Sequence, residues 1–335
     1  MSNNIIMAKK QKIAFITGVT GQDSSYLAEL LLEKNYKVIG LRRRTSTFNT
    51  ERVDHLYSNP NFIMEWGNVT DAFCLYSLLR KYKPDEIYHL AAQSHVKVSF
   101  EVPEETVDVI CMGTLRLLNA VKEICPNAKV YNAASSEMYG DNPEVPQNEL
   151  TRFMPASPYA CAKTFGFNIC RNYREAYGMH ISSGILFNHE SPRRGETFVT
   201  RKIVQAAVRI ANGKQEILEL GNLNASRDWG HAKSYVKAMW LMLQQEKPDD
   251  YVIASGKTYT VSEFLHLVFD KLSLDVEKHV RINPKYFRPH EVPFLLGDAG
   301  KAKKVLGWEN DLSLEDLVDD MIKEEISYLK NKNEI

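Results

Sequence analysis

Segments with strand character alternate with segments of helical character through the first half of the chain. Apolar and β-branched runs predict buried strands at 12–17, 37–41, 62–66, 86–92, 129–134 and 181–187. Amphipathic spacing predicts helices at 25–34, 71–82, 107–124 and 158–177. Regular alternation of this kind is typical of a parallel sheet covered by helices on both faces, because parallel strands need crossover connections. The sequence therefore predicts a doubly wound α/β fold.

The pattern becomes irregular after residue 187, and helical spacing returns only at 231–245, 261–272 and 314–330. With 335 residues and 44% hydrophobic content, the chain can form one large domain with a smaller lobe attached. It contains no internal repeat and no low-complexity linker. We expect a nucleotide-binding domain mainly within 1–187 and a smaller mixed α/β lobe mainly within 188–335, with about 228–255 returning to the first domain.

A glycine-containing turn follows the first predicted strand directly. Gly18 and Gly21 lie in the run Thr17-Gly18-Val19-Thr20-Gly21-Gln22-Asp23-Ser24. Glycines at such a strand-to-helix turn let the backbone approach a pyrophosphate, whose charge the helix N-terminus stabilises. Ser24 stands where a third glycine is expected, which predicts slightly looser packing of the helix on the strand. The position predicts a dinucleotide site.

Basic residues follow the second predicted strand, where NAD-binding proteins usually carry a carboxylate for the ribose hydroxyls. The sequence there is Arg42-Arg43-Arg44-Thr45-Ser46, without an acidic residue. Arginine suits a 2′-phosphate, so the cofactor predicted is NADP. The small residues of Leu90-Ala91-Ala92-Gln93-Ser94 end the fourth predicted strand, where the nicotinamide half would pass.

Tyr159 and Lys163 are four residues apart, so they share one face of a predicted helix that Ser157 caps and Pro158 begins. The ammonium and the helix N-terminus are expected to lower the pKa of the phenol toward working pH, making Tyr159 a base for a sugar hydroxyl. Spacing alone is weak evidence in a chain with 16 tyrosines. Glu137 in Ser135-Ser136-Glu137, after the fifth predicted strand, adds a carboxylate that can move a second proton. A structural cap is the alternative role for Glu137.

Composition argues against several classes of function. The 42 basic and 42 acidic residues cancel, which removes the electrostatic reason to expect nucleic acid or a membrane as a partner. No apolar run is long enough to span a bilayer, and residues 1–11 lack a signal-peptide core, so we expect a soluble cytoplasmic protein. The five cysteines show no metal-binding spacing, which predicts packed, reduced thiols, Cys161 included, and no metal site.

The chain resembles the extended short-chain dehydrogenases/reductases, and within them the GDP-mannose 4,6-dehydratase family, from about Lys12 to about Trp308. The resemblance is strongest in five strings: FNT at 48–50, AQSHV at 92–96, LFNHESPRRGETF at 186–198, RDWGHAK at 227–233 and YFRP at 286–289. It implies a Rossmann-type domain with a substrate-binding lobe.

The resemblance also implies roles for individual residues. The cofactor residues would be Gly18, Gly21, Gln22, Asp23, Arg43, Arg44, Ser46, Asn68, Val69, Leu90, Ala92, Gln93, Ser94, Lys163, His189 and Arg194. The residues facing the GDP-sugar would be Asn188, Lys202, Arg227, Arg288 and Glu291. The catalytic residues would be Ser135, Glu137, Tyr159 and Lys163, with Ser135 in place of the family's threonine.

The reaction implied is conversion of GDP-mannose, or of GDP-D-glycero-D-manno-heptose, to its 4-keto-6-deoxy derivative by internal hydride transfer through NADP. A GDP-sugar epimerase is an alternative, since it uses the same tyrosine and lysine without needing Glu137. A non-catalytic NADP-binding protein is another. The resemblance further implies a homodimer or homotetramer, in which the loop 42–54 reaches the cofactor site of a neighbouring subunit.

Overall fold

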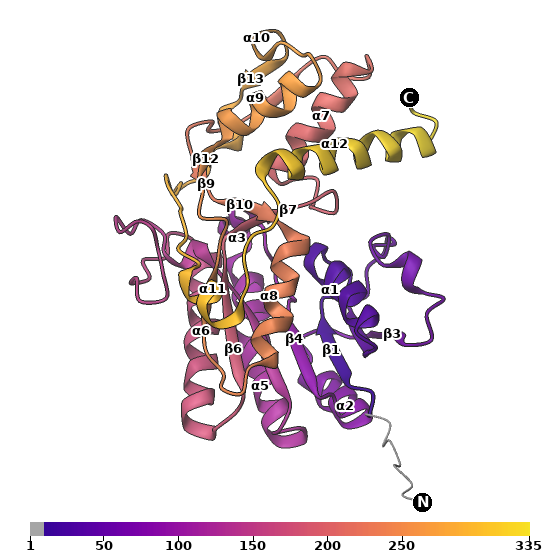
Figure 1. The fold of residues 1–335 in the computed structure, drawn as a ribbon, viewed down its shortest axis with the longest axis vertical. Helices are drawn as coiled ribbons and strands as arrows, with labels where there is room; N and C mark the ends of the chain where they lie inside the picture. The colour runs from indigo at the N-terminus through magenta and orange to yellow at the C-terminus, as the bar shows by residue number, and fades with distance from the viewer. Residues whose placement is uncertain (1–9) are drawn as a thin grey trace, which may run out of the picture.

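A computed structural model describes residues 10–335. Residues 1–9, part of the segment predicted to lack a signal-peptide core, lie outside that range. The chain forms a wide lower lobe around a large sheet and a narrower upper lobe of helices (Figure 1). Within 10–335, no helix is long and apolar enough to cross a bilayer.

The lower lobe is built on a seven-stranded sheet with the order β11-β6-β5-β4-β1-β2-β3, in which every neighbouring pair is parallel. Its strands are β1 (Ile13–Thr17), β2 (Lys37–Arg42), β3 (Phe62–Trp66), β4 (Glu86–His89), β5 (Lys129–Ser135), β6 (Ile181–Leu186) and β11 (Tyr251–Ile253). The order reverses between β1 and β4, and in such sheets a crevice opens at the carboxyl ends of the strands at this point. The doubly wound fold predicted from the sequence is confirmed.

Helices cover both faces of this sheet. One face carries α1 (Gln22–Glu33) and α8 (Ala232–Gln244), whose apolar side chains share a core with β1 and β2. The other carries α2 (Ala72–Tyr82), α5 (Gly113–Ile124) and α6 (Pro158–Tyr177), which enclose a second core. Burial on both faces explains why the strands are apolar without alternation.

The upper lobe packs around its own apolar core. Its helices are α7 (Val199–Ala211), α9 (Val261–Lys271), α10 (Val276–His279) and α12 (Leu314–Asn331), at the top of Figure 1. Short strands lie within the upper lobe and where the two lobes meet: β7 (Asn188–Glu190), β8 (Leu218–Leu220), β9 (Ser226–Arg227), β10 (Trp229–His231), β12 (Tyr259–Thr260) and β13 (Val280–Ile282). The other elements are α3 (Val96–Glu101), α4 (Pro103–Val107), α11 (Gly300–Leu306), a π-helical turn at Asp108–Met112, and 3₁₀ turns at Asp54–Leu56, Ser136–Met138 and Pro284–Tyr286.

Three predicted boundaries were wrong. The fourth strand ends at His89 and not at 92, because the Thr17 hydroxyl accepts hydrogen bonds from the amides of Leu90 and Ala91 and draws them out of the ladder. The helix expected at 107–124 is interrupted by the π-helical turn. The first helix begins at Gln22 and not at residue 25. Its N-cap is Gly21, which has no side chain that could signal a helix start in the sequence.

Candidate active site

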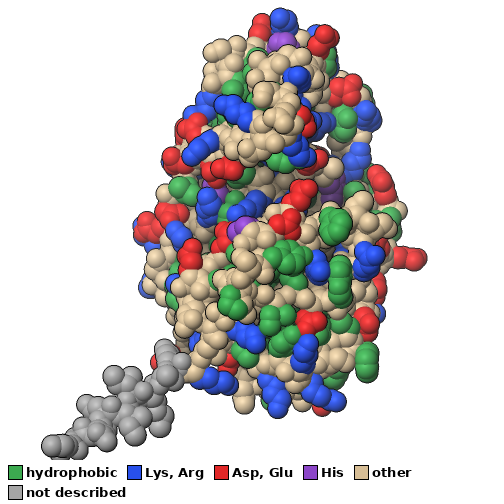
Figure 2. Space-filling model, turned by 90° about the vertical axis from the view of Figure 1, so that its right-hand side faces the viewer, with side chains coloured by type: hydrophobic (Ala, Val, Ile, Leu, Met, Phe, Trp, Pro, Cys, Tyr) green, Lys and Arg blue, Asp and Glu red, His purple; other side chains and the backbone are tan. Residues whose placement is uncertain are grey.

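A cleft of about 1080 Å³ lies between the two lobes, at the carboxyl ends of the sheet strands. Its lower wall comes from the turns after β1, β2, β4 and β5, and its upper wall from the segments around α7 and residues 220–229 and 286–291. Figure 2 shows basic, acidic and histidine side chains gathered at the waist between the lobes. Both lobes contribute polar groups to the cleft.

The glycine turn after β1 forms one end of the cleft. Gly18 has a φ of +73°, and a Cβ there would lie 3.0 Å from the Ala91 Cα, so a larger residue would clash with backbone. The turn places the first residues of α1, Gln22, Asp23 and Ser24, along the cleft. Their amides belong to the first turn, which has no intrahelical acceptors. This end can hold an anion such as a pyrophosphate.

A buried ion pair connects this turn to the segment after β6. The His189 Nε2 lies 2.8 Å from the Asp23 Oδ2, and Gln22 donates a hydrogen bond to the Asp23 Oδ1 over 2.9 Å. Burial opposes charge on both partners, but each holds the other ionised: the His189 imidazolium lowers the pKa of Asp23, and the Asp23 carboxylate raises that of His189. The His189 ring also stacks on Tyr235. The pair fixes the wall of the cleft.

Only part of the basic run after β2 lies at the cleft. Arg43 lines the cleft, but Arg44 and Ser46 do not. The Arg44 guanidinium donates to the Thr45 carbonyl and lies toward the Trp66 indole, 5.7 Å from the ring centroid. Of the three predicted phosphate ligands, the structure therefore brings only Arg43 to the site.

Three elements bring the predicted catalytic residues together. Ser135 ends β5, Glu137 follows in the 3₁₀ turn, and Tyr159 lies in the first turn of α6. The Ser157 hydroxyl accepts from the Ala160 amide as the N-cap, and the Tyr159 amide donates to the Ser99 hydroxyl. All three side chains are buried and line the same cleft. Their meeting comes from the adjacency of β5 and α6, which the alternation of elements predicts.

Lys163 lies one turn further along α6, beneath Tyr159. Its ammonium donates to the Ala133 carbonyl over 2.6 Å and lies 5.8 Å from the Tyr159 ring centroid. Burial lowers the pKa of Lys163 to about 8. It remains mostly charged at neutral pH, without a carboxylate in direct contact.

The expectation of a lowered phenol pKa was wrong for the protein without ligands. Burial raises the pKa of Tyr159 to about 12, outweighing the Ser135 hydroxyl, which lowers it, and the Glu137 carboxylate raises it further. Spacing predicts which groups are neighbours, but it does not predict how deeply the phenol is buried.

Glu137 faces a cluster of charged residues from the upper lobe. The Arg288 Nη1 lies 3.6 Å from the Glu137 Oε1 and 3.5 Å from the Glu291 Oε1. Arg227 pairs with Glu291 at 2.8 Å. The Arg288 Nη1 is buried but makes no hydrogen bond within the described residues. Two arginines beside a carboxylate suit a ligand that carries a diphosphate next to a sugar.

Every other predicted site residue lines the cleft. On the cofactor side these are Asn68, Val69, Leu90, Ala92, Gln93, Ser94 and Arg194, and on the substrate side Asn188 and Lys202. The Lys202 ammonium lies 3.6 Å from the centroid of the Tyr286 ring. Arg194 lies over the Phe198 ring, with its Nε 3.0 Å from the Glu190 Oε2.

Sequence reasoning missed several lining residues. They include Asn49, His95, Glu190, Glu196, Phe198, Asn222 and Tyr286. All of these except Asn222 lie within the strings that carry the resemblance, which was the available signal. His95 caps α3, because its side chain accepts a hydrogen bond from the Val98 amide. Helix α3 is short and has no periodic pattern that would have predicted this role.

One cysteine prediction was wrong. Cys161 lies on α6 between Tyr159 and Lys163 but is exposed, and it lines a separate hollow outside the cleft. Of the other cysteines predicted to pack in the interior, Cys111 and Cys170 are buried, whereas Cys74 and Cys125 are partly exposed. Within residues 10–335 no three His, Cys, Asp or Glu side chains are grouped as metal ligands.

Solved structures share the fold at low sequence identity. UDP-glucose 4-epimerase from Thermotoga maritima, solved with UDP-glucose, superposes with a TM-score of 0.84 at 24% identity and covers 95% of this chain and 99% of that one. dTDP-glucose 4,6-dehydratase from Streptomyces venezuelae, solved with NAD, gives 0.83 at 24% identity and covers 96% and 98%. At such identities the likeness shows the fold alone.

Sequence relatives are much closer. GDP-mannose 4,6 dehydratase 2 of Caenorhabditis elegans is 51% identical, with 96% of this chain and 91% of that protein aligned. GDP-mannose 4,6 dehydratase 1 of Arabidopsis thaliana is 52% identical, with 97% and 93% aligned. The model of the GDP-mannose 4,6 dehydratase family matches residues 15–321. The chain therefore belongs to the GDP-mannose 4,6-dehydratase family.

Proposed function

We propose that this protein is an NADP-dependent hydro-lyase that converts a GDP-sugar of the manno configuration to its 4-keto-6-deoxy derivative. The substrate is GDP-mannose or GDP-D-glycero-D-manno-heptose. The observation that carries the proposal is the position of Glu137, which lines the cleft with Tyr159 and Ser135 and lies 3.6 Å from Arg288 of the opposite lobe. A plain alcohol dehydrogenase or an epimerase has no use for a carboxylate at that place.

The residues divide the proton transfers among themselves. Tyr159 takes the proton from the sugar O4 as the C4 hydrogen departs as hydride. Because burial raises the pKa of this phenol, the transfer needs the phenolate to be supported by the positive charge of Lys163. The 4-keto group makes the C5 hydrogen acidic, and Glu137 removes it as a proton. Ser135 or the protonated Glu137 then gives a proton to the leaving O6 hydroxyl, so one water leaves across C5 and C6. As C6 is reduced, C5 takes up one proton, which equals the O4 proton that Tyr159 took, so the balance is loss of water with no net oxidation.

The residues present fit a nicotinamide dinucleotide. The Gly18 cradle, which a Cβ would fill, and the first turn of α1 would hold its pyrophosphate, and Lys163 lies at the far end beside Tyr159. When bound, this cofactor supplies reversible hydride acceptance, taking hydrogen from C4 and returning it to C6. Arg43 at the end of β2, with no acidic residue in the run 42–46, supports NADP over NAD.

The upper lobe would hold the GDP moiety. Arg227 and Arg288 would pair with the diphosphate, and Lys202 and Asn188 line the same cleft. Glu291, which holds the Arg227 guanidinium at 2.8 Å, would keep that arginine in place. We further propose a homodimer or homotetramer, in which the loop 42–54 meets a neighbouring subunit.

The test is to incubate the purified protein with NADP⁺ and each GDP-sugar separately, and to weigh the products. Loss of one water from GDP-mannose or from the GDP-heptose supports the proposal and identifies the substrate. A product of unchanged mass but altered stereochemistry would instead identify an epimerase. No product from either sugar, with NADP bound, would contradict the proposal.

A further inference from the structure

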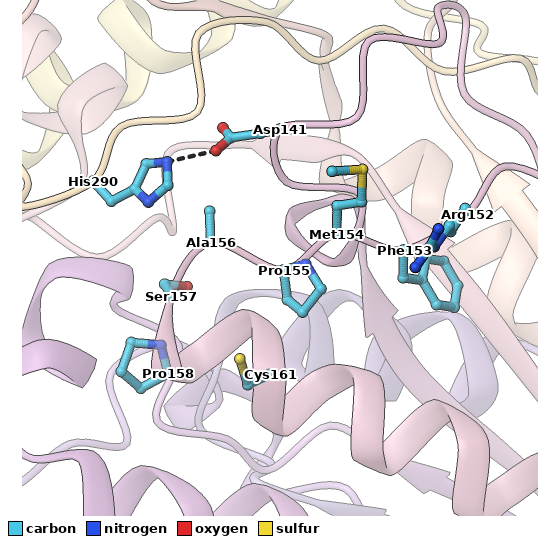
Figure 3. A pocket seen from close by; sticks show the side chains of 10 residues that line it. All are labelled: Asp141, Arg152, Phe153, Met154, Pro155, Ala156, Ser157, Pro158, Cys161 and His290. Carbon is cyan, nitrogen blue, oxygen red and sulfur yellow. Dashed lines mark hydrogen bonds and ion pairs between the residues drawn. The ribbon is translucent and has the colours of Figure 1, made fainter.

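Two ion pairs connect the same two segments on opposite sides of the cleft. Arg288 and His290 lie two residues apart in the upper-lobe segment, and Glu137 and Asp141 lie four residues apart after β5. Arg288 approaches Glu137 inside the cleft at 3.6 Å, whereas the His290 Nε2 lies 2.5 Å from the Asp141 Oδ2 outside it. Figure 3 shows His290 and Asp141 facing each other at the rim of the hollow beside α6.

Backbone hydrogen bonds do not fix the upper-lobe segment that carries Arg288 and His290. From 288 to 292 no backbone hydrogen bond is made with any described residue, although Phe287 and Pro293 on either side each take part in one. The contacts of this stretch, which we call the 288–292 loop, are made by side chains: Arg288 and Glu291 in the cleft, His290 on Asp141, and Val292 in a small core. Its placement therefore depends on those side chains.

The partner segment is fixed. Met138 and Tyr139 are fully buried, and the Tyr139 hydroxyl donates to the Asn148 carbonyl over 2.7 Å. Gly140 has a φ of +53°, and a Cβ there would meet the Met154 carbonyl oxygen, so the chain is tightly packed just before Asp141. The Asn142 side chain donates to the Arg152 carbonyl over 2.7 Å. Asp141 thus projects from a rigid base toward a loop that lacks backbone support.

From this contrast we infer that His290 and Asp141 are positioning residues for the GDP-sugar. Their pair anchors the 288–292 loop from outside the cleft and so sets where Arg288 and Glu291 lie relative to Glu137. The inference deepens the proposed function, on which its kinetic part rests. Neither residue belongs to the cleft lining, so neither would touch the substrate itself.

The size of the effect follows from exposure. The two side chains are 51% and 40% exposed, and ion pairs at such sites contribute little individually. Because side chains alone position the 288–292 loop, without backbone hydrogen bonds to described residues, loss of the pair is expected to raise the KM for the GDP-sugar about two- to five-fold. Glu137 and Tyr159 stay on their own rigid elements, so kcat is expected to change less than about two-fold.

The first measurement is amide hydrogen exchange in the protein with NADP bound and no sugar. His290→Ala and Asp141→Ala are expected to speed exchange of the hydrogen-bonded amides that flank the 288–292 loop, those of Phe287 and Ser226, about two- to five-fold, and the double variant no further than either single one. His290→Gln, whose side-chain amide can still donate to Asp141, is expected to restore slow exchange. Unchanged exchange in both alanine variants would overturn the inference.

The second measurement is the kinetics of the same variants. A rise in KM shared by both single variants and the double one, and reversed by His290→Gln, supports a positioning role. Faster exchange with an unchanged KM would make the pair merely structural and would overturn that role. If the parent protein dehydrates neither sugar, the proposed function falls, and the exchange comparison with a GDP titration decides whether the pair positions the nucleotide site.

Lys237→Ala is the matched control. Lys237 and Asp311 form a pair of 2.6 Å, each 50% exposed, that also joins distant parts of the chain but lies away from the cleft. Breaking it is expected to leave both the exchange of the Phe287 and Ser226 amides and the KM unchanged. An equal effect from this variant would show that the loss of any surface pair loosens the loop, which contradicts a specific role for His290.

Discussion

Glu137 is the residue on which dehydration depends in this account. It is buried, it lines the cleft beside Tyr159, and Arg288 is the charged group from the other lobe that lies nearest in the described site. The arginine can hold the carboxylate in place until a diphosphate competes for the guanidinium, because phosphate oxygens make stronger paired contacts. A carboxylate released in this way can accept the C5 proton.

Glu137→Gln is expected to slow water loss on the order of 10²- to 10⁴-fold, the usual cost of removing a general base. Oxidation at C4 depends on Tyr159, so reduced cofactor should still appear in a single turnover and then persist. Product mass and the absorbance of the reduced cofactor check this. Glu175→Gln, an exposed carboxylate on α6, is the control and should behave as the parent. Full water loss in Glu137→Gln would mean that another group is the base.

Lys163 carries a cost in stability that its removal should reveal. Its pKa falls from an ordinary 10.5 to about 8 on burial, so the unfolded chain holds the proton more tightly than the folded one. The penalty is fully present below pH 8, amounts to about 3 kcal/mol, and disappears as the pH rises to 10.5.

Lys163→Met is therefore expected to be about 1 to 3 kcal/mol more stable than the parent at pH 7, while losing activity. The lost hydrogen bond to Ala133 offsets part of the gain. Urea unfolding of the cofactor-free protein at several pH values checks this, and the advantage should shrink between pH 8 and pH 10.5. An advantage that stays constant across that range would contradict the lowered pKa.

At this scale the sequence predicted the identity of the site residues better than their state. The strings around 92–96, 186–198 and 227–233 located a substantial part of the cleft lining. They did not indicate how deeply Tyr159 is buried, and burial sets the direction in which its pKa shifts. The sequence also did not indicate that the Arg44 guanidinium donates to the Thr45 carbonyl and lies toward the Trp66 indole, outside the cleft lining.

Helix α6 is the element that positions the proton transfer. Its N-cap, Ser157, is buried and accepts from the Ala160 amide over 3.1 Å, and Tyr159 follows two residues later. Fraying of the first turn would therefore move the phenol itself, whereas fraying at the Gly178 end would not.

Ser157→Ala is expected to lower the free energy of unfolding by about 1 kcal/mol and also to lower kcat. Ser313→Ala, at the capping box of α12 away from the cleft, should cost a similar amount of stability with kcat unchanged. Thermal unfolding and steady-state kinetics of the two variants check this. Equal effects on kcat would show that the first turn of α6 is not specifically coupled to catalysis.

The elements that sequence patterns missed have physical features in common. Helix α7 begins at Val199 after Phe198, which provides no side-chain cap, so its start carries no signal. Strands β7, β9, β10 and β12 are two or three residues long, too short for an alternating pattern. The large sheet was predictable because its strands are long, apolar and separated by clear helices.

For the whole molecule, the surface near the β3 edge is unusually apolar. Phe48 is 95% exposed in the loop 42–54, and Trp66 and Phe73 are exposed nearby in the chain. Figure 2, which faces this side, shows hydrophobic side chains gathered on the lower lobe. Exposed apolar clusters of this kind mark contact surfaces, which agrees with the proposed homo-oligomer.

Phe48→Asp is expected to shift the protein to a smaller assembly, because a charge in a contact surface opposes burial. Leu150→Asp is the matched control, since Leu150 is 94% exposed but lies in a different loop. Sedimentation velocity of both variants checks this. A parent protein that sediments as a monomer would contradict the proposed assembly outright.

Internal hydride transfer can be followed through a single hydrogen atom of the sugar. GDP-mannose labelled with deuterium at C4 is incubated with the protein and NADP⁺, and the product is examined by NMR, with the labelled GDP-heptose in parallel. Internal hydride transfer with Tyr159 and Glu137 as bases predicts a 4-keto-6-deoxy sugar that carries the deuterium at C6. Deuterium returned to C4 of a stereoisomer, or water loss with deuterium released to solvent, would contradict it.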